Sequence, residues 1–167
     1  MLNDITIRPM HSGELEAVAK LFYDVWHETQ RHLQDPKRGK FRYLGFFQNR
    51  IHERKAHTLV AANGIHILGF ACWTGGHFNS LFVAKEARSS GLGSTLLQAT
   101  EAEMCNSGVA KFELDCLVGN EAGRRFYERH GWHISGERYW EDETSEGPAW
   151  ARAWVMEKSC RPQSSPK

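Results

Sequence analysis

The segment Phe78–Gly93, FNSLFVAKEARSSGLG, joins a strand pattern to a glycine-bearing helix start. Its apolar run, Leu81, Phe82 and Val83, is typical of a buried strand. The turn and helix start that follow consist of Arg88, Ser89, Ser90, Gly91, Leu92, Gly93 and Ser94. Glycine lets the backbone approach a ligand closely, and the first N–H groups of a helix lack internal partners and attract anions. The segment therefore predicts a phosphate-binding turn.

The glycine spacing alone does not identify the phosphate ligand. A dinucleotide fingerprint needs a further glycine at the position of Leu96. A Walker-type loop needs a terminal Gly-Lys-Ser/Thr, which this segment does not have. On spacing alone, Gly91 and Gly93 are as compatible with a tight strand-to-helix turn as with a ligand site. A second motif is needed to decide between them.

A second motif, Asn120–Trp132, reads NEAGRRFYERHGW and begins 27 residues after Gly93. Together the two motifs resemble the GCN5-related N-acetyltransferase (GNAT) family. In that family Q/R-x-x-G-x-G/A binds the pyrophosphate of acetyl-CoA, and N-x-x-(small)-x-x-F-Y carries the catalytic tyrosine. The resemblance covers about residues 57 to 140. Ser89 departs from the family pattern, because a glycine commonly follows the arginine.

The resemblance implies a role for each matching residue. Leu81–Val83 would offer backbone groups to the pantetheine arm and the thioester. Arg88–Ser94 would hold the pyrophosphate through backbone amides. Asn120 would bond to the pantetheine arm, and Tyr127 would protonate the departing CoA thiolate. A phenol is still protonated at pH 7, and a thiol with a pKa of about 8.5 leaves readily, so the chemistry agrees with this use of a tyrosine.

The acceptor amine needs a base, since an alkylammonium has a pKa near 10.4. Some GNAT members place a Glu or His six residues before the position of Val83, and this chain has His77 there. Histidine titrates in a range that suits a base. A turn histidine without a catalytic role is an equal alternative, and Asp115 and Glu28 are weaker acidic candidates.

In the GNAT fold the first two helices and their loop usually wall the acceptor site. The side chains expected to bind the acceptor are Trp26, His27, Tyr43 and Trp73. Core packing is the competing explanation for each aromatic residue. The acidic run Glu141–Glu143 is expected to form a loop, either simply solvated or able to attract a cationic amine.

The composition indicates a globular protein without nucleic-acid or membrane partners. The 167 residues are 41% hydrophobic and 25% charged, with a formal net charge of +1. No apolar run approaches the roughly 18 residues of a membrane span, and no export signal is recognised, so a cytoplasmic location is expected. The four cysteines are scattered, which predicts free thiols rather than a disulfide framework. His27-Glu28 narrowly misses a zinc motif, so no metal is expected.

The periodicity predicts an α/β protein with a mixed, mostly antiparallel sheet of six to seven strands and helices on both faces, as in the GNAT fold. The expected helices cover 12–33, 41–54, a segment from 91 to a stop at 106–108, and 120–131. The expected strands cover 5–8, 58–62, 66–73, 81–83, 112–118, 132–140 and 149–157. We expect residues 1–159 to form a single domain and residues 160–167 to form a flexible tail.

The sequence therefore predicts an acetyl-CoA-dependent N-acetyltransferase acting on a primary amine of a small molecule or peptide. Transfer is expected to be direct, because Cys116 has no His/Asp partner set for an acyl-enzyme. A non-catalytic acyl-CoA-binding sensor or regulatory module on the same fold and a nucleotide-binding protein are the alternatives. Dimerisation is common in this fold, and Trp150 and Trp154 are candidate contact residues for a homodimer. The identity of the acceptor stays open.

Overall fold

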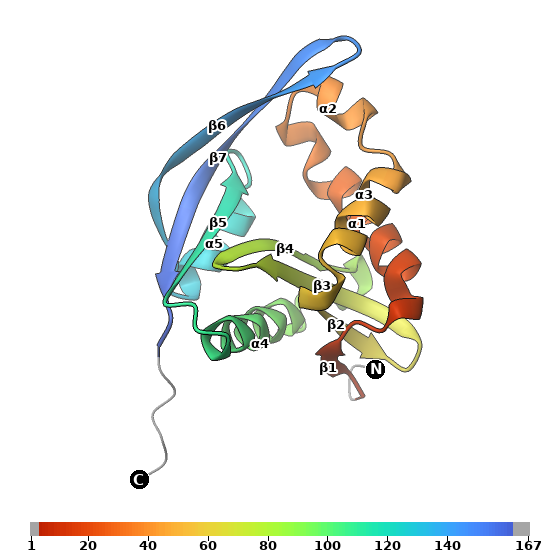
Figure 1. Ribbon diagram of the computed structural model, residues 1–167, viewed down its shortest axis with the longest axis vertical. Helices are drawn as coiled ribbons and strands as arrows, with labels where there is room; N and C mark the ends of the chain where they lie inside the picture. Colours follow the sequence, from red (N-terminus) through yellow and green to blue (C-terminus); the bar gives the residue numbers. More distant parts are fainter. Residues whose placement is uncertain (1–3, 162–167) are drawn as a thin grey trace.

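A seven-stranded sheet forms the centre of the protein, which we describe from a computed structural model over residues 4–161 (Figure 1). The strands lie in the order β1-β2-β3-β4-β5-β7-β6. They are β1 Thr6–Pro9, β2 Thr58–Asn63, β3 His66–Thr74, β4 His77–Val83, β5 Lys111–Leu117, β6 His133–Thr144 and β7 Gly147–Ser159. β4 and β5 pair in parallel, whereas the other neighbours pair antiparallel. The predicted mixed, mostly antiparallel sheet is confirmed.

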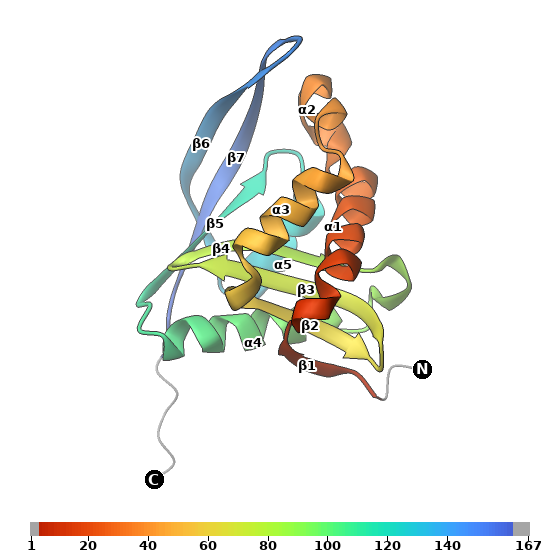
Figure 2. The same cartoon turned by 45° about the vertical axis from the view of Figure 1, so that its right-hand side comes forward.

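Helices cover both faces of the sheet (Figure 2). α1 Leu15–Thr29 and α3 Leu44–Glu53 pack on one face, and α4 Leu92–Asn106 and α5 Glu121–Arg129 pack on the other. A short helix, α2 Pro36–Lys40, lies between α1 and α3 in the chain. Within residues 4–161, no helix is long and apolar enough to cross a membrane.

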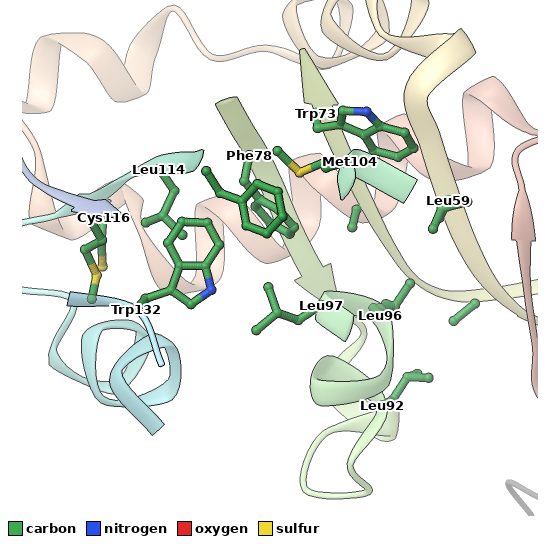
Figure 3. Close-up of a cluster of buried hydrophobic side chains, with 14 of the residues drawn as sticks. Leu59, Trp73, Phe78, Leu92, Leu96, Leu97, Met104, Leu114, Cys116 and Trp132 are labelled. Carbon is green, nitrogen blue, oxygen red and sulfur yellow. The ribbon is translucent and has the colours of Figure 1, made fainter. Parts of the chain in front are cut away.

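Two hydrophobic clusters, one on each face, hold these helices against the sheet. Successive residues of a strand point to opposite faces, so Val60 packs with Phe22 and Phe47 under α1 and α3, whereas Leu59 packs under α4. Figure 3 shows the α4 cluster, which also contains Trp73. Burial of each large side chain stabilises the fold by about 1.5–3 kcal/mol. Residues 58–62 of β2 are all buried, so this continuous apolar run needs helices on both faces of the sheet.

The connection between α1 and α3 differs from the prediction. The sequence predicts a break at Asp35-Pro36, but this dipeptide starts α2. An Asp35 carboxylate oxygen accepts a hydrogen bond from the Lys37 N–H at 2.9 Å. Pro36 occupies the first turn, where a helix does not use the missing N–H. The predicted helix 41–54 is correspondingly shorter and begins at Leu44.

The predicted acidic loop is instead the tip of a long hairpin formed by β6 and β7. The strands run to Thr144 and from Gly147, which has φ +104°. In both views this tip lies beside α2 (Figures 1 and 2). Lys37 Nζ donates to the Pro148 carbonyl at 3.1 Å, and Lys40 pairs with Glu146 at 2.7 Å. The prediction of a loop over 141–147 is wrong for residues 141–144, which belong to β6. The carboxylates of Asp142 and Glu146 are paired with Arg38 and Lys40.

The two tryptophans predicted as dimer contacts lie on β7 in different surroundings. Trp150 is 50% exposed, and its ring stacks on Tyr139 of β6 with the centroids 5.7 Å apart. Trp154 is partly buried under Arg124 of α5, whose guanidinium carbon lies 5.0 Å from the indole. Contact with a second copy of the chain stays a prediction for Trp150, and Trp154 already has an intramolecular partner.

β4 and β5 separate soon after they meet. Their parallel register contains the single pair His77–Glu113 within the described chain. The Glu113 N–H also donates to the Gly76 carbonyl at 2.9 Å. From Asn79 to Val83, β4 therefore continues with β3 as its ladder partner and diverges from β5 (Figure 1). A strand that loses its neighbour in this way offers backbone groups to an extended ligand.

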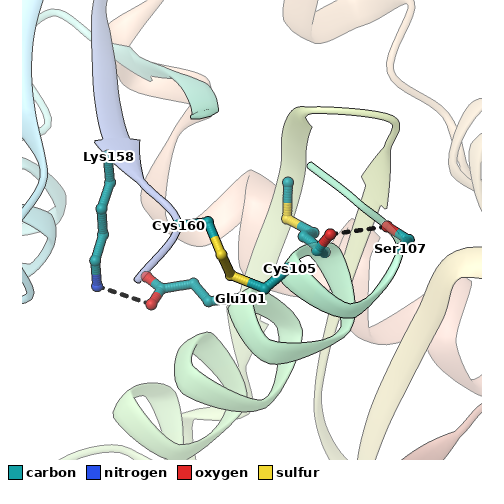
Figure 4. The surroundings of a disulfide bond; sticks show 6 residues. Glu101, Cys105, Ser107, Lys158 and Cys160 are labelled. Atoms are coloured by element: carbon teal, nitrogen blue, oxygen red, sulfur yellow. Dashed lines mark hydrogen bonds and ion pairs between the residues drawn. A yellow bond between two sulfur atoms is a disulfide. The ribbon is translucent and has the colours of Figure 1, made fainter. Parts of the chain in front are cut away.

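A disulfide joins Cys105 of α4 to Cys160, directly after β7 (Figure 4). The two Cα atoms are 5.7 Å apart, although the residues are 55 positions apart in the chain. The prediction of four free thiols is therefore wrong for this pair, because sequence spacing does not reveal that α4 ends beside the end of β7. Cys72 and Cys116 are free and buried, as predicted.

Two further contacts hold the same corner together. Lys158 Nζ lies 2.8 Å from a Glu101 carboxylate oxygen (Figure 4). The Cys160 N–H donates to the Ala110 carbonyl at 2.8 Å. The first residue of the predicted flexible tail is thus fixed. Residues 162–167 of that predicted tail lie outside the described residues.

Candidate active site

A left-handed turn connects β4 to α4 at the predicted phosphate site. Ser89 has φ +61°, and Gly91, directly before α4, has φ +83°. Glycine adopts positive φ freely, whereas a serine Cβ is crowded there. Beside the turn lies a cleft of about 450 Å³, here named the turn cleft. The predicted residues that line it are Leu81, Phe82, Val83, Arg88, Ser89, Gly91, Gly93, Ser94 and Asn120.

Two residues of the predicted phosphate segment have side chains with structural roles, and the predicted binding of pyrophosphate by their backbone amides stays a prediction. Leu92 is 6% exposed and belongs to the core under α4. The Ser90 hydroxyl donates to the Ala87 carbonyl at 2.5 Å and so closes the turn. The side chains of these two residues therefore shape the turn, and neither lines the turn cleft.

Replacing Ser89 by glycine is expected to stabilise the protein. The left-handed conformation costs a non-glycine residue about 1–2 kcal/mol of stability, which glycine avoids. The greater freedom of glycine in the unfolded chain cancels about 0.4–1 kcal/mol of this gain. We expect the melting temperature to rise by about 1–4 °C in a thermal melt without ligand. Ser94→Gly, placed inside α4, is the control and should lower it. A lower melting temperature for Ser89→Gly would contradict the strain assigned to this turn.

Arg88 connects the turn to α1. Its Nη1 and Nη2 atoms lie 3.0 and 3.1 Å from the two carboxylate oxygens of Glu28, and its Nε donates to the Val83 carbonyl at 3.2 Å. The hydrogen bonds from Arg88 lower the pKa of the Glu28 carboxyl below its usual value. Glu28, a weaker candidate base in the sequence, is thus an ionised partner that fixes Arg88.

Asn120 begins α5 as its N-cap. Its side-chain oxygen accepts a hydrogen bond from the Gly123 N–H at 3.0 Å, which satisfies one of the unpaired donors of the helix start. The side-chain nitrogen packs over Gly123, where a Cβ would lie only 2.5 Å away. Asn120 therefore has a structural role as the N-cap of α5. The same side chain would also have to make the predicted contact with a pantetheine arm.

A second cleft, here named the central cleft, adjoins the turn cleft. It has a volume of about 270 Å³ and lies between α1, α3, β4 and β5. The residues that line both clefts are Gln30, Leu81, Phe82 and Asn120. His77 and Tyr127, the two predicted catalytic residues, both line the central cleft. The residues Leu81 and Phe82 of β4 thus mark the place where the two clefts meet.

Tyr127 lies on α5 at the edge of the core. Its ring contacts Phe78, Phe126 and Trp132, with centroids 6.5, 5.2 and 5.9 Å away. The side chain is partly exposed at the central cleft, yet enough protein surrounds the phenol that burial raises its pKa above the ordinary value, and the nearby Cys116 adds to this effect. Tyr127 therefore keeps its proton well above neutral pH.

Cys116 also lines the central cleft, on β5. Burial raises the pKa of this thiol to about 12, and the nearby Glu121 carboxylate acts in the same direction. Its Sγ lies 3.7 Å from the Asn120 carbonyl, to which the thiol can donate. The thiol is thus fully protonated near pH 7, and thiols attack as thiolates. This environment agrees with the prediction that Cys116 is not a nucleophile.

His77 stands at the start of β4 between two carboxylates. Its Nδ1 lies 3.7 Å from a Glu113 oxygen, and its Nε2 lies 3.7 Å from an Asp115 oxygen. Arg138 of β6 binds both carboxylates, with contacts of 2.7 Å to each. The hydrogen bond from Arg138 holds the pKa of Glu113 below its usual value. The sequence did not predict the contact of Arg138 with these two carboxylates. In the sheet β7 lies between β5 and β6, so this contact depends on the tertiary structure.

The four predicted acceptor residues do not form one pocket. Trp26 lines the central cleft but is 7% exposed and belongs to the core under α1 and α3, so its contact with an acceptor stays a prediction. Tyr43 is 65% exposed and lines a separate groove toward the hairpin tip. His27 contacts the Arg42 carbonyl at 2.7 Å and lines neither of the two clefts. Trp73 is a correction, since it is 7% exposed in the core under α4 (Figure 3).

The central cleft contains charged residues that sequence reasoning missed. They are Arg38, Arg42, Arg50 and Arg54, contributed by α2, α3 and the segments beside them. The basic segment 37–42, KRGKFR, was a visible signal. Its meaning depends on the tertiary structure, because α2 was predicted as a break and the cleft forms only when these segments face β4 and β5.

Comparison with known proteins agrees with this arrangement. A family model described as an acetyltransferase (GNAT) domain matches residues 40–145. An uncharacterized N-acetyltransferase of Methanocaldococcus jannaschii is 38% identical over 80 residues, 46% of this chain and 51% of that protein. The chain thus matches about half the length of this curated relative.

Solved structures share the fold over nearly the whole chain. The GCN5-related N-acetyltransferase of Rhodopseudomonas palustris has a TM-score of 0.74 at 18% identity, covering 95% of this chain and 98% of its own. The PaiA N-acetyltransferase of Thermoplasma acidophilum, in complex with coenzyme A, has a TM-score of 0.69 at 19% identity, covering 93% and 98%. At these identities the similarity establishes the fold. With a family model that spans more than half of its residues, the chain belongs to the GNAT acetyltransferase family.

Proposed function

We propose that this protein transfers the acetyl group of acetyl-CoA directly to a primary amine in a ternary complex. The observation that carries the proposal is the meeting of the two clefts at Leu81 and Phe82, with Tyr127 and His77 lining the central cleft beside this junction. A donor molecule in one cleft and an acceptor in the other would bring their reacting atoms together there. Such positioning is a major source of rate acceleration.

The turn cleft supplies the features that a CoA donor needs. The N–H groups of the turn and of the start of α4 would bind the pyrophosphate, helped by the positive end of the helix dipole. The pantetheine arm would lie along β4, where β5 has diverged. The N–H near Leu81 would donate to the thioester oxygen as negative charge develops on it. Coenzyme A is bound in the structure of the PaiA relative, which supports this assignment.

The transfer requires one nucleophilic attack and one departure. The neutral amine nitrogen attacks the thioester carbon, the C–S bond breaks, the nitrogen loses its proton, and CoA leaves as a thiolate that takes up a proton. The raised pKa of Tyr127 makes its phenol a weaker acid than the CoA thiol. Tyr127 would therefore stabilise the departing sulfur chiefly by donating a hydrogen bond while the charge develops.

His77 would remove the proton from the acceptor nitrogen, directly or through water. We expect His77→Gln to lower kcat/KM most at low pH, because the amine must then arrive already neutral. The difference from wild type should shrink as the pH approaches the pKa of the amine, about 10. His66→Gln, at an exposed position, is the matched control. A pH profile of kcat/KM that is unchanged in His77→Gln would exclude His77 as the base.

The proposed activity is tested by binding followed by turnover. Acetyl-CoA should raise the melting temperature more than ATP or NAD does, and a panel of primary amines should then contain substrates that release free CoA thiol. If acetyl-CoA stabilises the protein but no amine in the panel causes release of CoA thiol, the result would support a non-catalytic binding module instead. Stronger stabilisation by ATP or NAD would support a nucleotide-binding protein.

A further inference from the structure

Four arginines line the central cleft opposite the strands that would hold the thioester. They are Arg38, Arg42, Arg50 and Arg54, here named the arginine cluster. The other charged residue that lines the cleft is Asp115, which is already bound by Arg138 at 2.7 and 2.8 Å. The cleft that would receive an amine therefore has an excess of positive charge.

Arg38 is the most deeply placed member of the cluster. It is 8% exposed, and its Nη1 is buried without a hydrogen-bond partner among residues 4–161. Its Nε forms an ion pair with an Asp142 oxygen at 3.0 Å. Buried guanidinium donors without acceptors are costly. An anionic ligand bound in the cleft would supply an acceptor for this group.

A single carboxylate serves two of these arginines. Asp142 lies 3.0 Å from Arg38 Nε and 3.3 Å from Arg42 Nη2. Within residues 4–161, the carboxylate paired with Arg50 is that of Glu53, at 3.7 Å. Burial lowers the pKa of Arg38 and of Arg42, and for Arg42 the repulsion from Arg38 is the next cause. The charges of the cluster are thus only partly compensated.

Aromatic rings hold the guanidinium groups in place. The guanidinium carbons of Arg42 and Arg50 lie 4.0 and 5.0 Å from the Phe46 ring, and that of Arg38 lies 5.5 Å from the Trp140 ring. A guanidinium over a ring keeps the N–H groups at its edge available for planar acceptors. This arrangement suits a carboxylate or a phosphate, which guanidinium groups bind with two parallel hydrogen bonds.

The charge of the cleft also argues against a simple cationic acceptor. Attraction of a cationic amine was one of two interpretations of the acidic run 141–143, but Asp142 of this run is paired with Arg38 and Arg42. A polyamine would place several positive charges beside the arginine cluster and would be repelled. A zwitterionic or anionic amine would place its negative group on the cluster and its amine toward His77.

We propose that the acceptor is a small amine that carries an anionic oxygen group, a carboxylate or a phosphate, bound by the arginine cluster. The proposal rests on the acetyl transfer proposed above and names the acceptor class of the same site. The central cleft, at about 270 Å³, has room for a metabolite-sized acceptor of this kind. While the cleft holds no substrate, the Asp142 carboxylate neutralises part of the positive charge of the arginine cluster in place of the anionic group of the acceptor.

Matched acceptor pairs test this proposal. One arm compares L-amino acids with their amides, and the other compares O-phosphoethanolamine with ethanolamine. We expect kcat/KM for the anionic member to exceed that for the neutral member by at least about tenfold in one arm, since charge-assisted hydrogen bonds are involved. The arm with the larger ratio identifies the carboxylate or the phosphate as the recognised group. Equal rates, or a preference for the neutral members in both arms, would overturn the proposal.

Two substitutions move this ratio in opposite directions. Arg50→Gln, whose native side chain is 43% exposed and therefore tolerant of replacement, should lower the ratio about tenfold. Asp142→Asn should raise it several-fold, because it removes the competing carboxylate from Arg38 and Arg42. Damage to folding would lower the rates for both members of a pair and leave the ratio unchanged. A ratio that neither substitution moves would contradict the role of the cluster.

Anion binding without turnover separates this proposal from the proposed function. With the protein saturated by CoA, inorganic phosphate or acetate should raise the melting temperature of wild type more than that of Arg50→Gln. If amines are acetylated but the pairs show no anionic preference, only the acceptor class is wrong. If anions bind at the cluster but no amine is acetylated, the proposed transfer is wrong and the anion site stands. No stabilisation by either anion, together with no anionic preference, overturns the site.

Discussion

Replacing Tyr127 by phenylalanine is expected to lower kcat at least about tenfold, while acetyl-CoA binds with nearly unchanged affinity. The substitution removes only the hydroxyl, and the ring keeps its contacts with Phe78, Phe126 and Trp132. The lost group is the proposed donor to the departing thiolate, which matters only as the C–S bond breaks. Steady-state kinetics with a good acceptor, together with calorimetric titration of acetyl-CoA, measure both parts of the prediction.

Tyr139→Phe is the matched control, because Tyr139 is 59% exposed on β6. It should leave kcat within about twofold of wild type. The raised pKa of Tyr127 adds a second expectation. Because the folded protein holds the phenol proton above its ordinary pKa of about 10, kcat should not fall as the pH rises from 8 to 10 through ionisation of this residue. Full activity of Tyr127→Phe would remove the hydroxyl from the mechanism.

Removal of the Cys105–Cys160 disulfide is expected to lower the stability of the protein, by more than Ser89→Gly is expected to raise it. The bond closes a loop of 55 residues, and its loss should lower the free energy of unfolding by about 2–4 kcal/mol. In the chain-entropy account, the cause is the greater freedom of the unfolded chain without the cross-link. For Cys105→Ser/Cys160→Ser we expect the melting temperature to fall by about 5–15 °C.

A reducing agent provides the control for this prediction. It should lower the melting temperature of wild type toward that of the double variant and leave the double variant unchanged. The ion pair of Lys158 with Glu101 and the hydrogen bond of Cys160 with Ala110 are independent of the sulfur atoms and should keep the corner folded. Equal melting temperatures for oxidised wild type and the double variant would show that the cross-link adds no stability.

The sheet and the main helices could be predicted because their signals are local. Alternation along 112–118 and the three-four spacing of apolar residues in α1 follow from how each element buries one face. The start of α2 was missed because Pro36 was taken as a break, although proline is favoured in a first helical turn. The disulfide was missed because the proximity of its two residues is a property of the tertiary structure.

The residues of the candidate site also divide into those with a local sequence signal and those that only the tertiary structure brings together. The turn at Ser89–Gly91 and the pair Asn120 and Tyr127 could be proposed from sequence, since each lies in a short motif with fixed spacing. Trp73 was misplaced, because an aromatic residue at a strand end fits a pocket and a core equally well. The arginine cluster was missed because its members come from separate segments and gain their meaning only when they share one cleft.

Acetyl transfer itself is tested most directly by following the labelled acetyl group of acetyl-CoA. The protein is first mixed with the donor alone, then with a neutral or anionic primary amine, and the products are separated by mass. Direct transfer predicts unmodified protein in the first step, then acetylated amine and free CoA thiol in equal amounts. An acetylated protein before the amine is added, or thiol release without acetylated amine, would contradict direct transfer to an amine.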